Sequence, residues 1–436
     1  MLLYTKALSN RLQYICETIF GNNISITTNI DDVYAYKGFI INYSINQIVE
    51  TELHIYPIHL LFENNITTQT IQCFNWKNEK AFFKTTQGIG FDILAASFYL
   101  ISRYEEYITN EKDEHFSFSY KNSLAFKENF LLQPLVNIWW KLIQQDYPNL
   151  KLATSLFKFT TTFDVDIAYK YKHHALLKNL LSTAKELTKL NFKNALKRWM
   201  VLLNYKNNND PYDVFDWLNV LHTKMNINTI FFCLCQLKRS RYDVNLSIHS
   251  KGLKILYKKI NALNNMGIHP SYSSGKMQLN NNSDLLVREI QPLQNIIQHP
   301  IKKSRQHYLV MQLPNTYNTL VSKNIEEDYT MGYNYVNGFR ASYCKSFYWF
   351  NVVTNTKTSL LIHPFCAMDS NFIFFQNYSS DAALAELKKL YDTVKKYDGE
   401  LITVFHNHFA DIQIKNWDWK KLYQSFLEYH HSHKIG

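Results

Sequence analysis

Short apolar runs alternate with helical segments from residue 156 to the end of the 436-residue chain, and this alternation constrains the fold most strongly. The short runs are rich in β-branched and aromatic residues, which is typical of buried strands. Strands that alternate with helices form a parallel α/β barrel or an open sheet. In both architectures the chemistry collects where the strands end.

The first of these strands ends in two carboxylates. The run from Thr160 leads into Asp164 and Asp166, which are separated by one residue. Alternate side chains of a strand lie on one side, so the two carboxylates can share a pocket. Such a pair repels unless a cation or proton lies between its members, which favours one metal ligand and one base. A solvated or turn-forming pair of aspartates is the alternative interpretation.

Three later strand ends carry further polar residues. His269 follows one apolar run, Arg305 and His307 follow another, and His406 ends the run from Leu401. Each histidine alone would more often have a structural role. Together with the aspartates, these residues could supply a metal site, a base, a charge clamp and an acid.

Composition excludes several classes of protein. Hydrophobic residues make up 46% and charged residues 19%, which is typical of a packed globular chain with room for two domains. The formal charge of +11 is spread along the chain without a nucleic-acid-binding motif, so we expect no nucleic-acid partner. Cys233 and Cys235 lie in an apolar run and are expected to be buried thiols. Neither a signal peptide nor a transmembrane segment is evident, which predicts a cytoplasmic protein.

Residues 1–155 predict a smaller mixed α/β domain without a catalytic cluster. Its helical pattern over residues 92–107 includes Glu105 and Glu106, which we expect on a solvated face. In the second half, Asp210–Pro211 predicts a helix start, and the histidine-rich C-terminus predicts a frayed tail. The basic helical stretch from His173 to Leu203 could pack on its own protein or lie on a membrane surface.

The order of these motifs resembles that of the polysaccharide deacetylases (NodB-homology, carbohydrate esterase family 4). Thr162–Asp166 is similar to the family's T-F-D-D motif with one residue inserted, and His269 matches the first histidine of its H-(S/T)-x-x-H motif. The resemblance covers residues 156–436 and implies a distorted (β/α)7-type, NodB-like barrel. Residues 1–155, notably 92–107, resemble an uncharacterised domain that precedes such deacetylases in bacterial proteins, which implies a boundary at 155/156.

The resemblance also implies roles for single residues. Asp164 would be the base and Arg305 would hold it, while His406 would protonate the leaving group. Asp166 and His269 would bind a divalent metal, Zn²⁺ ahead of Co²⁺, Mn²⁺ or Ni²⁺.

One departure from the family pattern concerns the metal. Ser273 stands where the motif has its second histidine, and two protein ligands hold a catalytic metal poorly. His307 is the candidate third ligand, because it would share a strand side with Arg305. A hydrogen bond from His307 to substrate or backbone is the alternative.

Further residues are expected around a sugar. Asp328 or Asp369 would orient His406, and a backbone N–H of Ser271 or Tyr272 would bind the oxyanion. Tyr329 and the pair Phe339–Arg340 would line the pocket, and a structural loop is the alternative. The complete set of expected substrate-side residues is Tyr272, Asp328, Tyr329, Phe339, Arg340 and Asp369.

The expected function is hydrolysis of an acetyl group, N-acetyl ahead of O-acetyl, from a sugar or polysaccharide precursor. A catalytically silent carbohydrate-binding protein on the same barrel is one alternative, since it would explain the missing histidine. A D-x-D glycosyltransferase is another, although it leaves His269, Arg305 and His406 without roles.

Overall fold

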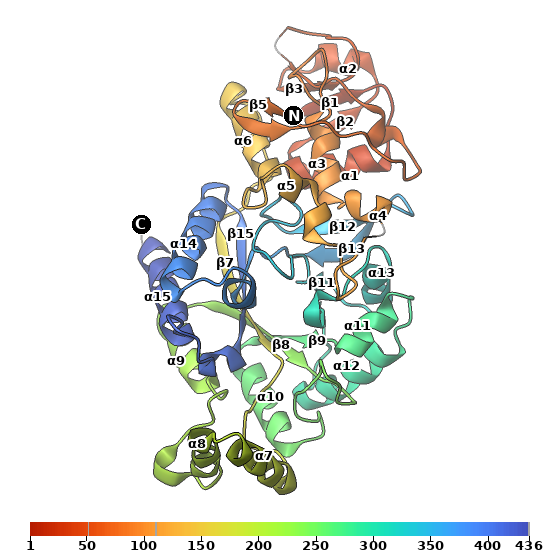
Figure 1. Cartoon of the computed structure of the whole chain (residues 1–436). Coiled ribbons are helices and arrows are strands. Elements are labelled where there is room, and N and C mark those ends of the chain that lie inside the picture. The colour runs from red at the N-terminus through yellow and green to blue at the C-terminus, as the bar shows by residue number, and fades with distance from the viewer. Residues whose placement is uncertain (51, 110, 435–436) are drawn as a thin grey trace. The chain divides into compact units, whose positions relative to one another are not determined.

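The computed structural model describes residues 1–50, 52–109 and 111–434, and the chain forms two compact units (Figure 1). Unit 1 contains Met1–Lys158, Met311–Cys366 and Leu390–Leu401. Unit 2 contains Phe159–Val310, Ala367–Lys389 and the chain from Ile402 onward. The first junction lies near residue 155, but two later segments group with the N-terminal part. The predicted division into residues 1–155 and 156–436 stays a prediction.

Unit 1 is a mixed α/β unit with a small parallel sheet in the order β2-β1-β3-β4. Strands β5 and β6 form an antiparallel pair, and β13 pairs with β11 in parallel and with β12 in antiparallel fashion. The strands are β1 (Leu2–Thr5), β2 (Ser25–Thr27), β3 (Ile40–Tyr43), β4 (Leu53–His54), β5 (Phe74–Trp76), β6 (Glu79–Ala81), β11 (Glu327–Asp328), β12 (Phe347–Asn351) and β13 (Thr356–Ile362). The helices are α1 (Asn10–Phe20), α2 (Ile30–Ala35), α3 (Ile93–Ile101), α4 (Glu105–Ile108), α5 (Leu124–Lys127), α6 (Leu135–Asp146) and α13 (Asn315–Ser322), with the 3-10 turns η1 (Gly21–Asn23), η2 (His59–Phe62) and η3 (Tyr120–Asn122).

Helix α3 is buried along its whole length, as expected for a helix that is apolar all round. The Asp92 side chain caps it by accepting a hydrogen bond from the Ala95 N–H at 2.9 Å. The expectation of a solvated face at Glu105 and Glu106 is wrong, because both residues are buried, 6% and 4% exposed. Buried arginines of unit 1 pair with them.

Unit 2 contains a parallel sheet with the order β10-β9-β8-β7-β15-β14. Its strands are β7 (Lys158–Val165), β8 (Asn228–Leu234), β9 (Asn265–His269), β10 (Lys303–Ser304), β14 (Ala367–Met368) and β15 (Glu400–His406). Every residue of β7 after Lys158 is buried, because a central parallel strand is covered on both faces. The expected parallel α/β architecture is confirmed, whereas closure into a (β/α)7 barrel stays a prediction.

The helices of unit 2 are α7 (Leu176–Thr188), α8 (Phe192–Leu202), α9 (Phe215–Met225), α10 (Lys251–Leu263), α11 (Tyr272–Gln278), α12 (Asp284–Ile297), α14 (Ser380–Lys396, in unit 2 up to Lys389) and α15 (Trp419–Lys434). Its short turns are η4 (Tyr205–Asn207), η5 (His307–Leu309), η6 (Asn371–Phe375, π-helical) and η7 (Asn407–Asp411). Among all described helices of the chain, none has the length and apolar character needed to cross a bilayer.

Two local predictions in unit 2 are wrong. Asp210 does not cap a helix, since α9 begins only at Phe215; its carboxylate instead accepts backbone N–H groups of residues 170–172. The segment 430–433 is not a frayed tail, because α15 continues to Lys434 and the ring centroids of His430 and Phe159 are 4.7 Å apart. Cys233 and Cys235 are free and buried, which confirms the expectation for them.

Candidate metal centre

The polar residues of the site lie at the carboxyl ends of the strands of unit 2. Asp164 and Asp166 are at the end of β7, and His269 and His406 are the last residues of β9 and β15. His307 follows β10 by three residues. Because the strands are parallel, their carboxyl ends meet at one edge of the sheet, and the side chains converge there.

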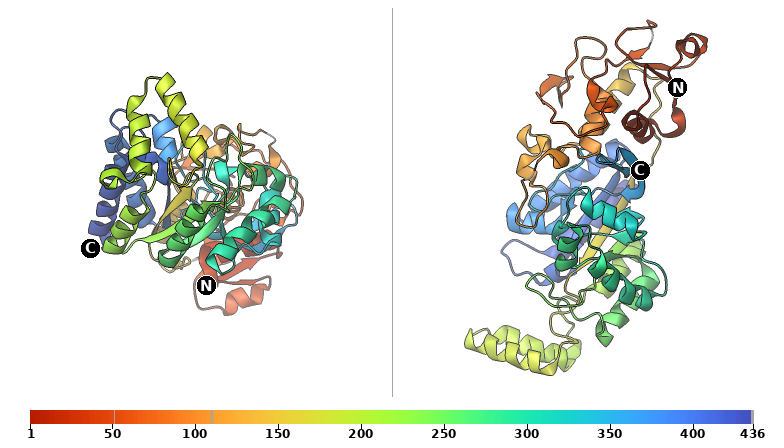
Figure 2. Two further views of the ribbon diagram at one scale, coloured as in Figure 1. Left: turned by 90° about the horizontal axis from the view of Figure 1, so that it is seen from below. Right: turned by 90° about the vertical axis from the view of Figure 1, so that its right-hand side faces the viewer.

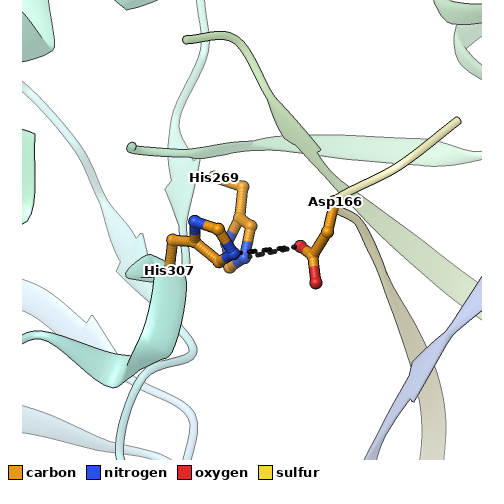
Figure 3. Close-up of side chains that lie close together, drawn as sticks. All are labelled: Asp166, His269 and His307. Atoms are coloured by element: carbon orange, nitrogen blue, oxygen red, sulfur yellow. Dashed lines mark ion pairs between the residues drawn. The ribbon is translucent and has the colours of Figure 1, made fainter. Parts of the chain in front are cut away.

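Asp166, His269 and His307 form a compact cluster of three potential metal ligands, whose ligand atoms all lie within 4.8 Å of one another. The Asp166 Oδ1 atom is 3.2 Å from His269 Nε2 and 3.7 Å from His307 Nε2. Both imidazoles direct these nitrogens at the carboxylate (Figure 3). His307 is the first residue of turn η5. It does not lie on a strand with Arg305, as expected from the sequence, because β10 ends at Ser304.

Hydrogen bonds at the opposite ring nitrogens fix the orientation of both histidines. His269 Nδ1 donates to the backbone oxygen of Arg305 at 2.6 Å, and His307 Nδ1 donates to Asp243 Oδ1 at 3.0 Å. A histidine that donates through Nδ1 presents the lone pair of Nε2, which is the arrangement found around protein-bound metals. Both Nε2 atoms are therefore available as ligands.

The Asp166 carboxylate supplies the test of whether a cation fits. Its Oδ1 atom is buried and receives no hydrogen bond within the part of the chain that the structure describes. A buried carboxylate oxygen without a donor is costly unless a positive charge compensates it. Two imidazole nitrogens and one carboxylate form the three-ligand set of catalytic zinc sites, so these residues fit a divalent cation.

Asp164 lies beside this cluster and is held by Arg305. Arg305 Nη1 donates to Asp164 Oδ1 at 3.0 Å and to Thr162 Oγ1 at 2.6 Å. The other oxygen of Asp164, Oδ2, is 3.8 Å from His269 Nε2. One carboxylate oxygen is thus anchored, and the second lies next to the candidate metal ligands.

His406 is held by Asp369 and lies near Asp166. Its Nδ1 donates to Asp369 Oδ1 at 2.6 Å, and its Nε2 lies 3.7 Å from Asp166 Oδ2. Asp369 Oδ2 also accepts the backbone N–H of His406 and the Trp419 Nε1–H. Of the two aspartates considered for orienting His406, Asp369 contacts it, whereas Asp328 accepts hydrogen bonds from Thr330 within unit 1.

The pKa values of the cluster follow from burial and mutual charge. Burial would lower the pKa of His406, but Asp369 and Asp166 raise it to about 9. Burial would raise the pKa of Asp166, but His307, His269 and His406 hold it well below its ordinary value. His408, two residues further on, has a pKa lowered to about 3 by burial. His406 therefore carries the proton at neutral pH, and His408 does not.

The expected oxyanion donors are wrong, because carboxylates already accept both backbone N–H groups. The Ser271 N–H donates to Glu289 Oε2 at 3.1 Å, and the Tyr272 N–H donates to Asp243 Oδ1 at 2.8 Å. The Tyr272 ring stacks on Tyr242 with ring centroids 3.9 Å apart.

Four of the expected substrate-side residues belong to unit 1, whereas the cluster belongs to unit 2. Arg340 is 1% exposed and donates from Nε and Nη2 to the two oxygens of Glu106. Tyr329 stacks on His363, and Asp328 and Phe339 are buried.

Asp243 is the functional residue that the sequence did not reveal. It lies in the loop after β8, and an isolated aspartate in a long loop carries no pattern. The only available signal was topological, because loops that follow the carboxyl ends of parallel strands face the site.

Comparison with known protein families gives a match for the N-terminal segment alone. Residues 1–148 match DUF7033, a family of unknown function. No curated protein matches the chain.

The solved structures that match this chain include three from the polysaccharide deacetylases. A protein assigned to them from Mycobacterium smegmatis has a TM-score of 0.40 at 11% identity and covers 64% of this chain and 85% of its own. One from Pseudomonas aeruginosa PAO1 has a TM-score of 0.39 at 9% identity, covering 64% and 86%. The polysaccharide deacetylase of Bacillus cereus has a TM-score of 0.30 at 12% identity, covering 64% and 89%.

Proposed function

We propose that unit 2 is a metal-dependent hydrolase that removes an acetyl group, N-acetyl ahead of O-acetyl, from a sugar or polysaccharide precursor. The observation that carries this proposal is the arrangement around Asp166. A three-ligand cluster lies beside both a carboxylate held by Arg305 and an imidazole held by Asp369. Metal-assisted hydrolysis of an acetamide uses a cation, a base and an acid that lie close to one another.

Asp166, His269 and His307 would hold the divalent metal, with Zn²⁺ the best match to their nitrogen and oxygen donors. When bound, such an ion polarises an acyl oxygen and lowers the pKa of bound water. His307 supplies the third ligand that the missing motif histidine left open. The missing motif histidine was the reason to consider a catalytically silent carbohydrate-binding protein. With His307 as the third ligand, that reason no longer applies.

Asp164 is the proposed base. Because Arg305 fixes the carboxylate through Oδ1, Oδ2 has a defined direction and can accept a proton from the attacking water. Arg305 is fully buried, so the clamp does not exchange with solvent.

His406 is the proposed acid. Its pKa of about 9 keeps the imidazolium protonated at neutral pH, and Asp369 fixes the ring so that Nε2 delivers the proton. An amine leaves only when it is protonated, whereas an alkoxide depends less on this step. A buried, charged acid therefore favours an amide substrate.

Replacing Asp164 with asparagine tests the proposal, because Asn keeps the shape of the side chain and removes the proton acceptor. We expect kcat to fall about 10²–10⁴-fold on an acetylated sugar with a chromogenic reporter. The zinc content from elemental analysis should stay near one equivalent. Asp216→Asn, at a carboxylate 76% exposed, is the matched control. Activity of Asp164→Asn close to wild type would remove the proposed base.

A further inference from the structure

Helices α7 and α8 form a hairpin, residues 176–202, that projects from the rest of unit 2 (Figure 2). Most of its large apolar side chains are exposed, including Leu177 at 67% and Leu181 at 63%. They recur at helical spacing along one side of each helix. The exposed side chains include Leu176, Leu177, Leu180 and Leu181 on α7 and Phe192 and Leu196 on α8.

The contact between the two helices is polar. Arg198 of α8 donates to Asn179 Oδ1 at 2.9 Å and pairs with Glu186 at 2.6 Å. Trp199 Nε1 donates to Thr183 Oγ1 at 3.1 Å. The hairpin therefore buries its polar groups and exposes its leucines, which reverses the usual order. Exposed apolar surface gathered in this way marks a binding surface.

The charge of the hairpin region identifies the kind of surface that it fits. Residues 172–206 contain seven lysines and one arginine against a single glutamate, Glu186, which Arg198 neutralises. This segment carries much of the +11 net charge of the chain. An apolar stripe flanked by lysines is typical of helices that lie in the interface of an anionic bilayer. Nucleic acid would use the lysines but not the leucines.

The length of the hairpin helices and the place where the hairpin leaves the sheet agree with a hairpin that lies on a bilayer surface without crossing the bilayer. A helix of 13 residues such as α7 is about 20 Å long, shorter than the ~30 Å hydrocarbon core. The hairpin leaves the sheet after Asp166, at the edge that carries the candidate metal centre. Asp411 of η7, which follows His406, pairs with Lys170 at 2.6 Å and with Lys197 of α8 at 3.1 Å.

We propose that the α7–α8 hairpin docks unit 2 on the surface of an anionic bilayer. The leucine stripe enters the headgroup region, and the lysines contact lipid phosphates. This inference goes beyond the proposed hydrolase activity and does not depend on it.

Co-sedimentation of the full chain with lipid vesicles tests the proposal. We expect the protein to pellet with vesicles that contain about one third phosphatidylglycerol, less with pure phosphatidylcholine, and less at high salt because exposed charges are screened. No pelleting with the anionic vesicles would overturn the proposal.

Two sets of variants distinguish vesicle binding through the hairpin from non-specific binding through other exposed residues of unit 2. The apolar set replaces three exposed leucines by serine, which should weaken anionic-vesicle binding at least about tenfold. Its matched control replaces three exposed apolar residues elsewhere in unit 2 and should bind like wild type. The hairpin substitutions are Leu176→Ser, Leu177→Ser and Leu181→Ser, and the control substitutions are Val220→Ser, Ile255→Ser and Leu263→Ser.

The charge set reverses three exposed lysines of the hairpin segment, with three exposed lysines of α10 as its matched control. Binding should fall about tenfold or more for the hairpin reversals and much less for α10, because only the first set lies beside the apolar stripe. The hairpin reversals are Lys185→Glu, Lys189→Glu and Lys193→Glu, and those of α10 are Lys251→Glu, Lys254→Glu and Lys258→Glu.

Circular dichroism of every variant verifies that it is folded. Equal binding by hairpin and control variants would overturn the proposal. It would also be overturned if sedimentation velocity showed a dimer that only the hairpin leucine variants dissociate, since a second copy would then cover the stripe.

Discussion

Asp243 determines what His307 can do in the cluster. A carboxylate on Nδ1 holds the ring in one orientation and keeps the Nε2 lone pair directed at Asp166. Asp243 also accepts the Tyr272 N–H, so one side chain connects the loop after β8 to the start of α11. In the proposed metal site, His307 would compensate for the departure from the expected histidine motif, and Asp243 would support it from a different loop.

Asp243→Asn should weaken zinc binding about 10–100-fold, because an amide holds the imidazole less firmly than a carboxylate does. The amide oxygen can still accept the Tyr272 N–H, so the loop should keep its conformation. Competition with a chromogenic chelator measures the affinity without reference to activity. Asp216→Asn should bind like wild type. Unchanged affinity in Asp243→Asn would show that His307 does not depend on this carboxylate.

Asp369→Asn tests the positioning of His406. The substitution removes the charge that holds the imidazolium, and we expect kcat to fall about 10²–10⁴-fold with zinc affinity nearly unchanged. Asp328→Asn changes the other aspartate that the sequence offered, whose carboxylate bonds Thr330 in unit 1, and should leave kcat of the folded protein near wild type. The reverse ranking of the two variants would contradict the assignment.

At the scale of elements, local patterns predicted the helical segment 92–107, which contains α3 and α4, the helical stretch of α7 and α8, and the strands β7 and β15. These elements follow from hydrophobic periodicity, which a single chain displays. The local predictions that were wrong have one cause. In each case the structure of the segment depends on contacts with residues that are distant in sequence. Asp210 resembles a helix cap, yet it bonds the backbone of residues 170–172.

The site shows the same division. Asp164, Asp166, His269 and His406 could be predicted because strand ends concentrate chemistry. Their supporting contacts could not, because Asp243 and Trp419 approach from elements far away in sequence. The sequence suggested both Asp369 and Asp328 as the residue that orients His406. Choosing Asp369 required the fold.

Helix α4 carries a buried ionic group that the sequence interpretation had placed in solvent. Glu106 accepts from Arg340 at 2.7 and 2.9 Å and from Arg103 Nε at 2.7 Å, all within unit 1. Burial alone would raise the pKa of Glu106, but Arg340 and Arg103 lower it to about 2. Glu106 thus links α4 to the segment at Arg340, which is remote in sequence.

Glu106→Gln should lower the free energy of unfolding by about 3–5 kcal/mol, because it leaves buried guanidiniums without their counter-charge. A carboxylate with a depressed folded pKa stabilises above its unfolded pKa of about 4.3 and loses that contribution as the pH falls toward 2. The difference between wild type and Glu106→Gln should therefore be largest above about pH 5 and shrink in acid. Urea unfolding across this pH range measures it, with exposed Glu111→Gln as control. A pH-independent difference would refute the ionic explanation.

At the scale of the whole molecule, the two units contain different kinds of buried charge. In unit 1 the carboxylate of Glu106 is matched by the guanidiniums of Arg103 and Arg340. In unit 2 the Asp166 Oδ1 atom is buried without a donor within the described residues, beside two oriented imidazoles. A metal ion should therefore stabilise unit 2 selectively.

Thermal unfolding with and without zinc tests this selectivity. An ion that binds only the folded state adds about 2.7 kcal/mol at a hundredfold excess over its Kd, a shift of about 5–10 °C in the Tm of a unit of this size. The chelator EDTA should reverse the shift, and His307→Ala should abolish most of it, because two protein ligands remain. Glu106→Gln should lower the stability of unit 1 and still show the full zinc-induced increment. An equal increment in His307→Ala would mean that zinc binds elsewhere, since the increment should depend on the Nε2 atom that Asp243 directs at Asp166.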